Sequence, residues 1–176
     1  MASFVVLVNG VPGAGKTTLS AELGRVLAVP VVSKDAVKEA LADAVDAVLP
    51  TSPLGAVASD AMWSIAALID GAVVIESFWF TGRDDAFLAA GLRTAGAIRG
   101  VEVWCEAPVD VMRMRFRTRA RHAAHDDAAR TAEWEVFAQA AAPLSGFPVV
   151  RVATDGPVDV AALAAAIDSV RGRRDG

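Results

Sequence analysis

A short segment near the start of the chain, Gly10–Thr17, constrains the fold more than any other part of the sequence. It matches the pattern G-x-x-x-x-G-K-[ST] at every position and directly follows the apolar run Phe4–Val8. Such a continuous run is typical of a strand buried on both faces of a parallel sheet. The pattern indicates phosphate binding only where it connects a strand to a helix, and we expect a helix from Lys16 to about Ala28. The segment therefore predicts a phosphate loop within an α/β fold.

The residue types of this loop suit the binding of a polyphosphate. Glycines let main-chain N–H groups converge on phosphate oxygens, where side chains would intrude. The helix that begins near Lys16 directs the positive end of its dipole at the same anion. Lys16 can reach the β- and γ-phosphates of a nucleotide, and the Thr17 hydroxyl can ligate Mg²⁺. A purely structural turn is the alternative, which the complete pattern in this context disfavours. The expected nucleotide-binding residues are Gly10, Pro12, Gly13, Ala14, Gly15, Lys16, Thr17 and Thr18.

Strand-length apolar runs and longer helical stretches alternate along the whole chain, which predicts a parallel sheet with helices on both faces. No internal repeat or linker interrupts this pattern, so we expect one domain over residues 1–176. The expected strands are Phe4–Val8, Val29–Val32, Ala72–Ile75, Val101–Glu106 and Pro148–Val152. The expected helices are Lys16–Ala28, Asp35–Val48, Ala56–Asp70, Asp84–Ala97, Pro108 into Arg113–Arg121, Asp127–Ala141 and Pro157–Val170, before a frayed tail at Arg171–Gly176.

Composition narrows the partners and the compartment. The formal net charge of −4 argues against a nucleic-acid partner. No stretch approaches the ~20 apolar residues that span a bilayer, so no membrane association is expected. The single cysteine, Cys105, excludes an intramolecular disulfide and fits a reducing, cytoplasmic environment. Both a monomer and a homodimer are compatible with these features.

A carboxylate and a lysine follow the second expected strand, in Ser33-Lys34-Asp35-Ala36-Val37-Lys38. Ligands of open parallel sheets bind beyond the carboxyl ends of the strands, which places Asp35 beside the phosphate loop. There Asp35 can accept the proton of a substrate hydroxyl as a general base, or it can simply cap the helix. Lys38 lies one helical turn later and can hold a substrate anion, or it can be solvated.

Glu76 stands at the carboxyl end of the third expected strand. The aromatic run Phe78-Trp79-Phe80 follows after one serine. Glu76 either positions Mg²⁺ through water or a polar substrate group, or it is a partly buried side chain paired with a cation. Aromatic side chains usually belong to the core. Three successive aromatics cannot all face inward on a period of two, however, so at least one is expected to line a pocket. Trp63 and Met62, on the preceding helix, are candidates to join it.

Five arginines alternate along the segment Arg113–Arg121 and form the densest charge in the chain. A solvated helical face or a nucleic-acid patch is the ordinary interpretation of such a run. In a small kinase, however, this part of the chain forms a lid whose arginine stabilises the transferring phosphoryl group. Arg119 is the first candidate for that role and Arg115, on the same helical face at i, i+4, is the second. His122 and His125 lack further ligands for a metal site and are interpreted as lid or surface residues.

The sequence resembles small phosphate-loop kinases of the chloramphenicol phosphotransferase, gluconate kinase and polynucleotide 5′-hydroxyl kinase type. The resemblance spans most of the chain. It rests on the residues Gly10–Thr17, on Ser33–Lys38 with its aspartate and basic residue, on Pro108–Arg119 and on Thr154-Asp155-Gly156-Pro157. It implies a three-layer P-loop NTPase fold with sheet order 2-3-1-4-5, a helical lid at about residues 115–130, and the use of ATP with Mg²⁺. Lys38 stands where the polynucleotide kinases carry arginine, and Glu76 where many members carry aspartate.

These observations favour an ATP-dependent kinase that phosphorylates a hydroxyl of a small organic molecule, such as an antibiotic or a related metabolite. Its catalytic residues would be Asp35, Lys16, Arg119 and Arg115. Its acceptor would contact Lys38, Glu76, Phe78, Trp79 and Trp63. A nucleic-acid 5′-hydroxyl kinase and a nucleotide-binding regulatory or toxin-like protein are the alternatives.

Overall fold

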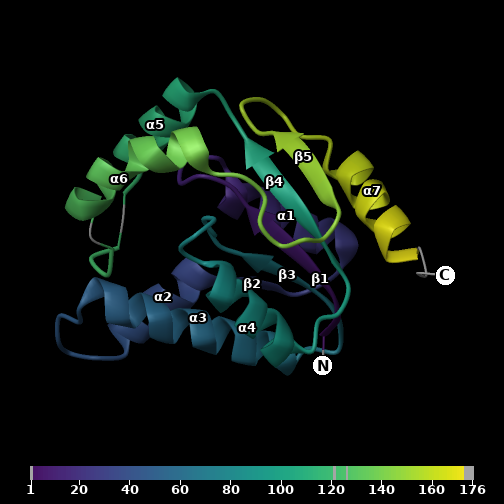
Figure 1. Ribbon diagram of the computed structural model, residues 1–176, viewed down its shortest axis with the longest axis horizontal. Coiled ribbons are helices and arrows are strands. Elements are labelled where there is room, and N and C mark those ends of the chain that lie inside the picture. Colours follow the sequence, from purple (N-terminus) through teal and green to yellow (C-terminus); the bar gives the residue numbers. More distant parts are fainter. Residues whose placement is uncertain (1, 121, 126, 173–176) are drawn as a thin grey trace.

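Five parallel strands form the centre of the molecule, in the order β2-β3-β1-β4-β5 (Figure 1). This computed structural model describes residues 2–120, 122–125 and 127–172. The order confirms the arrangement that the resemblance implied. The strands are β1 (Ala2–Asn9), β2 (Val31–Ser33), β3 (Gly71–Glu76), β4 (Gly100–Glu106) and β5 (Val149–Ala153).

Helices cover both faces of the sheet, as the alternation of strands and helices predicts. Along β1, Phe4, Val6 and Val8 belong to a core shared with α1, α5, α6 and α7. Val5 and Leu7 point to the opposite face and pack with α3 and α4. The helices are α1 (Lys16–Leu27), α2 (Lys34–Asp43), α3 (Thr51–Ala67), α4 (Asp85–Ala95), α5 (Val109–Thr118), α6 (Asp127–Ala140) and α7 (Val160–Gly172).

Several helix ends differ from the sequence expectation. Helix α2 ends at Asp43 rather than Val48, and α3 begins at Thr51 rather than Ala56. Pro53, which suggested a loop, lies in the first turn of α3, where a missing N–H breaks no helical hydrogen bond. Helix α5 ends at Thr118, so the arginine segment is only partly helical. The end of the expected frayed tail, residues 173–176, lies outside the described residues.

A buried polar network joins the central strand to both of its neighbours. The Asn9 side-chain amide donates to Glu102 Oε1 on β4 at 2.8 Å, and its Oδ1 accepts from Gly10 N at 2.7 Å and Trp79 N at 3.1 Å. Glu102 is 1% exposed and also accepts from the backbone N–H groups of Leu144 and Ser145. Buried polar groups of this kind are costly unless each has a partner. The network therefore fixes the start of the phosphate loop against the segment that follows β3.

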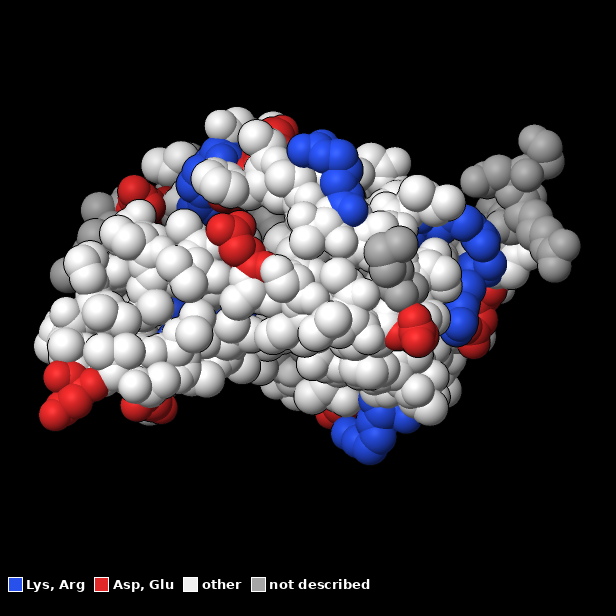
Figure 2. All heavy atoms as spheres, turned by 90° about the horizontal axis from the view of Figure 1, so that it is seen from below, with Lys and Arg blue, Asp and Glu red and all other residues white. Residues whose placement is uncertain are grey.

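The outer face over α2, α3 and α4 carries few charged side chains (Figure 2). Exposed apolar residues on this side include Val57, Ile65 and Leu68 of the α3 region. Among the described residues, no helix combines the length and the apolar character that crossing a membrane requires.

We predict that Glu102→Ala destabilises the fold by about 3 kcal/mol, because it removes the charged acceptor of the buried Asn9 amide and of two partly buried backbone N–H groups. Chemical denaturation followed by far-UV circular dichroism measures this. The matched control is Glu106→Ala on the same strand. Glu106 pairs with Arg151 at the surface, and its loss should cost less than about 1 kcal/mol. Equal costs for the two variants would contradict the assigned role of the network.

Candidate active site

The phosphate loop turns sharply between β1 and α1, at glycines whose backbone conformation other residues rarely adopt. Gly13 has φ +97°, and a Cβ atom there would collide with the main chain of Met112 on α5. Gly15 has φ +78° and caps the start of α1. These two positions explain why the loop needs glycine. The resulting turn places the N–H groups of the loop at the amino end of α1.

Two side chains from the second half of the chain hold this loop. Thr154, directly after β5, places its Oγ1 2.7 Å from the carbonyl oxygen of Ala14, and the Trp134 indole on α6 donates to the carbonyl oxygen of Pro12 at 2.8 Å. The loop is therefore braced from both sides before any ligand binds, which reduces the entropy that binding would cost.

Lys16, near the end of the phosphate loop, is buried. Its Nζ donates to the carbonyl oxygen of Gly10 at 2.7 Å and lies 5.8 Å from the ring centroid of Phe78. Burial lowers the pKa of Lys16, while the negative field of Glu76 opposes that change. A cation held in this way is desolvated and already positioned for an anion.

Glu76 ends β3 and lies in register with Ser33, the last residue of β2. The Ser33 hydroxyl donates to Glu76 Oε2 at 2.5 Å and also accepts from the N–H of Ala36 in the first turn of α2. Glu76 is 3% exposed. Burial raises its pKa above the ordinary value, and nearby Lys16 opposes this. A desolvated carboxyl therefore lies close enough to Lys16 for each group to affect the pKa of the other.

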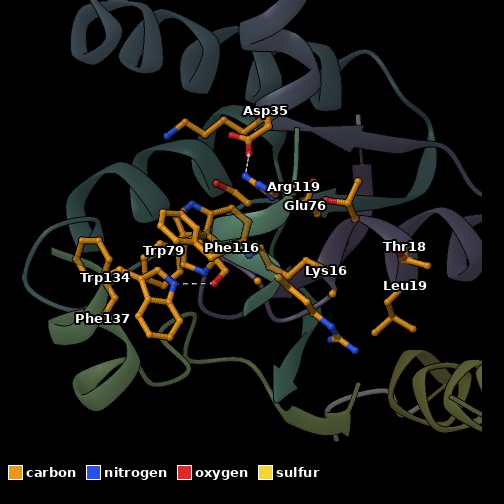
Figure 3. Close-up of a pocket in the computed structure, with 18 of the residues that line it drawn as sticks. Lys16, Thr18, Leu19, Asp35, Glu76, Trp79, Phe116, Arg119, Trp134 and Phe137 are labelled. Carbon is orange, nitrogen blue, oxygen red and sulfur yellow. Dashed lines mark hydrogen bonds and ion pairs between the residues drawn. The ribbon is translucent and has the colours of Figure 1, made fainter. Parts of the chain in front are cut away.

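Asp35 and Arg119 point toward one another across the mouth of the cleft (Figure 3). Arg119 Nη2 lies 3.9 Å from Asp35 Oδ2, and both side chains remain substantially exposed. Asp35 stands in the first turn of α2, as the sequence predicts, and lines the same cleft as Lys16. Arg119 has an extended backbone directly after α5, so it does not share a helical face with Arg115.

The other arginines of the segment have different surroundings. Arg115 lines the cleft and donates to the carbonyl oxygen of Thr154 at 3.0 Å. Arg113 forms a two-pronged ion pair with Glu135 and lies over the ring of Trp134. Arg121 lies outside the described residues.

The two histidines connect the turn at residues 122–125, which we call the lid turn, to α2. His125 Nε2 lies 2.9 Å from Glu39 Oε1, and His122 Nε2 lies 2.9 Å from Asp43 Oδ1. The side chain of His125 is 1% exposed. Of the range 115–130 expected to form a helical lid, the described part thus contains the end of α5, this turn and the first residues of α6.

Two residues expected to contact the acceptor do not line the cleft. Lys38 is 2% exposed, because its position on α2 faces the packed interior instead of the cleft. Trp63 is also 2% exposed and packs closely on Gly91 of α4, with its ring centroid 6.2 Å from that of Trp79. Lys38 is thus neither at the cleft nor solvated, and Trp63 takes the core position that is usual for aromatic residues.

The cleft that collects these groups has a volume of about 1250 Å³. Binding pockets commonly have volumes of about 300–1000 Å³, so the space suits more than one drug-sized molecule. Figure 3 shows Trp79, Phe116, Trp134 and Phe137 gathered on one side of Lys16, with Thr18 and Leu19 on the other. The phosphate loop lines the cleft with Pro12, Gly13, Gly15, Lys16 and Thr17. The next residue of α1, Thr18, and the aromatic residues Phe78 and Trp79 line it as well.

Several residues that line the cleft were not among the sequence candidates, and three of them add a cation or an aromatic ring to it. Arg83 follows the aromatic run, and Phe137 and Trp134 lie on α6. The dipeptide Arg83-Asp84, so soon after Phe78-Trp79-Phe80, is a signal that could have indicated the first of them. Nothing local indicates the other two, because α6 reaches the cleft only through the tertiary fold.

Comparisons with known proteins bear on the family and the fold of the chain. A family model described as an AAA domain matches residues 5–144. A protein of Chloroflexus aurantiacus j-10-fl, described as a putative kinase, superposes with a TM-score of 0.80 at 28% identity, covering 94% of this chain and 97% of its own. Among curated proteins, none matches the sequence.

Two more distant structures share the fold. The Mycobacterium tuberculosis APS kinase, in complex with AMPPNP and APS, gives a TM-score of 0.64 at 14% identity, covering 97% of this chain and 98% of its own. The Deinococcus radiodurans tunicamycin resistance protein gives 0.60 at 17% identity, covering 98% of this chain and 97% of its own. The sheet and its helices are thus those of P-loop kinases.

We predict that Glu76→Gln becomes more stable relative to the wild type as the pH rises above the ordinary glutamate value of 4.5. A pKa that is raised in the folded state means that the folded protein holds this proton more tightly, so stability is lost as the pH rises through the shifted pKa. Urea denaturation at pH 4 and pH 8 measures the difference. Asp168→Asn, an exposed change on α7, is the control, and a stability gap independent of pH for Glu76→Gln would contradict the prediction.

Proposed function

This chain belongs to the family described as an AAA domain, and from the geometry of its cleft we propose that it transfers the γ-phosphate of ATP to a hydroxyl of a small organic molecule. The observation that carries the proposal is the convergence of Lys16, Asp35 and Arg119 on one cleft. They come from the segments that follow β1, β2 and α5. Together they supply a phosphate-binding cation, a candidate base and a second cation beside that base.

In this mechanism Asp35 receives the proton of the acceptor hydroxyl as its oxygen attacks the γ-phosphorus. The new bond joins the acceptor oxygen to phosphorus, the bond between the γ-phosphorus and the bridging oxygen breaks, and ADP leaves. An exposed carboxylate paired loosely with Arg119 at 3.9 Å remains able to accept a hydrogen bond from a substrate hydroxyl. Arg119 then lies where charge develops on the transferring group.

The nucleotide would be held by main-chain N–H groups of the loop and by Lys16. Binding phosphate would replace the carbonyl oxygen of Gly10 as the partner of the Lys16 ammonium group. The amino end of α1 adds a favourable dipole. The cleft continues past Thr18, Gly156 and Pro157, where the rest of the nucleotide would lie.

Mg²⁺ fits the chemistry of the residues in this cleft. The Thr17 hydroxyl and the Glu76 carboxyl are oxygen donors, which this ion prefers, and both line the cleft. Over the described ranges there is no cluster of three or more His, Cys, Asp or Glu side chains able to hold a metal. Thr17 and Glu76 would therefore hold the ion together with nucleotide phosphates and water, where it would neutralise phosphate charge.

The acceptor side of the cleft favours a small molecule over a nucleic-acid end. Phe78, Trp79 and Phe137 provide apolar surface there. Arg113 and Arg115, which could have formed a basic tract, are engaged with Glu135 and Thr154 within the chain. Antibiotics and related metabolites are a plausible acceptor class, and the fold is shared with a tunicamycin resistance protein. We place the protein in the cytoplasm, as a monomer or a homodimer.

We predict that Asp35→Asn retains ATP binding and loses transfer by about 10²–10⁴-fold, the usual contribution of a general base. Transfer from γ-labelled ATP to a panel of phenicols, aminoglycosides, macrolides, sugars, nucleosides and a 5′-hydroxyl oligonucleotide measures this. Lys16→Ala should weaken both binding and transfer.

Asp60→Asn removes an exposed carboxylate of α3 outside the cleft and should behave as the wild type. Label found only on the oligonucleotide would support a nucleic-acid kinase instead. ATP binding without transfer to any acceptor, with Asp35→Asn indistinguishable from wild type, would support a regulatory protein.

We also predict that the two cleft arginines respond differently to removal. Arg119→Ala should lower kcat by roughly 10³-fold with little change in Tm, because its side chain is 37% exposed and pairs with the exposed Asp35 only at 3.9 Å. Arg115→Ala should mainly lower Tm and nucleotide affinity, because Arg115 braces the Thr154 segment behind the loop. Steady-state kinetics and thermal denaturation of both variants measure these effects. A large loss of kcat confined to Arg115→Ala would give Arg115, and not Arg119, the role at the transferring phosphoryl group.

A further inference from the structure

Arg83 occupies a position in the cleft that the proposed transfer does not use. It lies in the segment between β3 and α4 and lines the cleft, and its side chain is 45% exposed. Its guanidinium carbon lies 5.2 Å from the ring centroid of Phe78 and 5.0 Å from that of Phe137. The ring of Phe80 is third, at 6.0 Å. Three aromatic faces therefore surround a cation that still reaches solvent in the cleft.

Asp84 fixes the orientation of this guanidinium. The Asp84 carboxylate accepts from the backbone N–H of Phe80 at 2.8 Å, so the chain itself holds it in place. Arg83 donates to the same Oδ2 atom through Nε at 3.0 Å and Nη2 at 2.6 Å. Within the part of the chain that the structure describes, no hydrogen bond engages Nη1, the other arm of the fork. One edge of the guanidinium is thus anchored, and the other is available to a ligand.

The place of Arg83 relative to Lys16 indicates which ligand it would meet. The Phe78 ring lies close to both cations, 5.8 Å from Lys16 Nζ and 5.2 Å from the Arg83 carbon. Lys16 and Arg83 therefore lie at the same ring. Arg83 follows β3, which stands on the same side of β1 as β2 and the Asp35 segment after it. Gly156 and Pro157, which we assign to the rest of the nucleotide, follow β5 on the opposite side of β1, and Thr18 lies on α1. A group bound at Arg83 would belong to the second substrate.

We propose that Arg83 binds an anionic oxygen group, a carboxylate or a phosphate, on the phosphate acceptor, and so selects acidic hydroxyl compounds over neutral ones. This rests on the proposed kinase function. A planar guanidinium recognises such groups through paired hydrogen bonds, and a site flanked by rings strengthens them by excluding water. Because Asp84 and the three rings already hold the guanidinium, little side-chain entropy is lost when the acceptor binds.

The test compares acceptors that differ only in charge. A library of hydroxyl compounds is arranged in pairs, among them glycerate, mandelate and hydroxybenzoate beside their methyl esters, and glycerol 3-phosphate beside glycerol. Binding to protein loaded with AMPPNP and Mg²⁺ is measured by thermal shift, and transfer is measured with labelled ATP. We expect the acidic members to bind and to be phosphorylated in preference to their neutral partners.

The variant Arg83→Met keeps an unbranched stem against the rings and removes the charge. It should raise KM for the acidic acceptor about 10–100-fold, the usual effect of losing a hydrogen bond to a charged group, with kcat changed much less. KM for the neutral partner should stay the same. Arg93→Met, which removes an exposed arginine near the end of α4, is the matched control and should leave both values unchanged. Arg83→Lys should restore only part of the affinity, because it keeps the charge and loses the fork.

The outcomes separate this proposal from the proposed function. Binding or transfer restricted to neutral members would overturn the role of Arg83 while leaving the kinase intact. The same is true if KM for an acidic acceptor is unchanged in Arg83→Met, or if no acidic member shifts the melting of the loaded protein. A protein that fails to bind AMPPNP would instead overturn the kinase function itself. Equal loss of kcat on acidic and neutral acceptors in Arg83→Met would show a merely structural role.

Discussion

The side-chain amide of Asn9 is the interaction on which the arrangement of the site depends. It lies at the carboxyl end of the central strand, where every element of the cleft must be placed. Its oxygen receives the first N–H of the phosphate loop and the N–H of Trp79, and its nitrogen reaches Glu102 on β4. One buried group therefore sets the loop relative to the strands on both sides. Because a buried amide without partners is costly, alternative placements of these segments are disfavoured together.

The charged groups of the cleft are arranged so that burial and pairing balance each other. Lys16 and Glu76 are both buried and shift one another's pKa toward the ionised forms, against the effect of desolvation. Asp35 and Arg119 repeat the pattern at the exposed mouth, where water screens their attraction. The inner pair provides a rigid, low-dielectric site for phosphate. The outer pair stays loosely associated, which suits groups that must exchange partners during a reaction.

Local patterns predicted the parts of this protein whose structure is decided locally. The loop at Gly10–Thr17 and the position of Asp35 after β2 follow from strand ends and glycine conformations, which a single sequence displays. Lys38 was assigned to the cleft from its place one helical turn after Asp35, and Trp63 from its place on the helix before the aromatic run. Only packing decides whether such a position meets a cavity or a core. The end of α5 at Thr118, before the extended Arg119, has no local signal in the sequence, because no glycine or proline stands there.

Arg83 was missed as a cleft residue because part of its environment arises only through tertiary packing. Its surroundings combine Phe78 and Phe80, a few residues away, with Phe137 on α6. Two of these three rings are visible as near neighbours in the sequence, and the third reaches Arg83 only once α6 has packed against the phosphate loop. The indole of Trp134, on the same helix, donates to the loop at Pro12. A single helix thus braces the nucleotide side and completes the acceptor side, so the two halves of the cleft are mechanically connected.

The contacts of the lid turn extend this connection to the candidate base. Helix α2 carries Asp35 in its first turn and, farther along, Glu39 and Asp43, to which His125 and His122 bind. Thr51, at the start of α3, adds a hydrogen bond to the carbonyl oxygen of Ala124. The segment that bears Arg119 and the helix that bears Asp35 therefore meet at several points beyond their own ion pair. A displacement of the lid turn must either break these contacts or carry α2 with it. The distance between Asp35 and Arg119 therefore depends on the position of the lid turn, through contacts that lie outside their own ion pair.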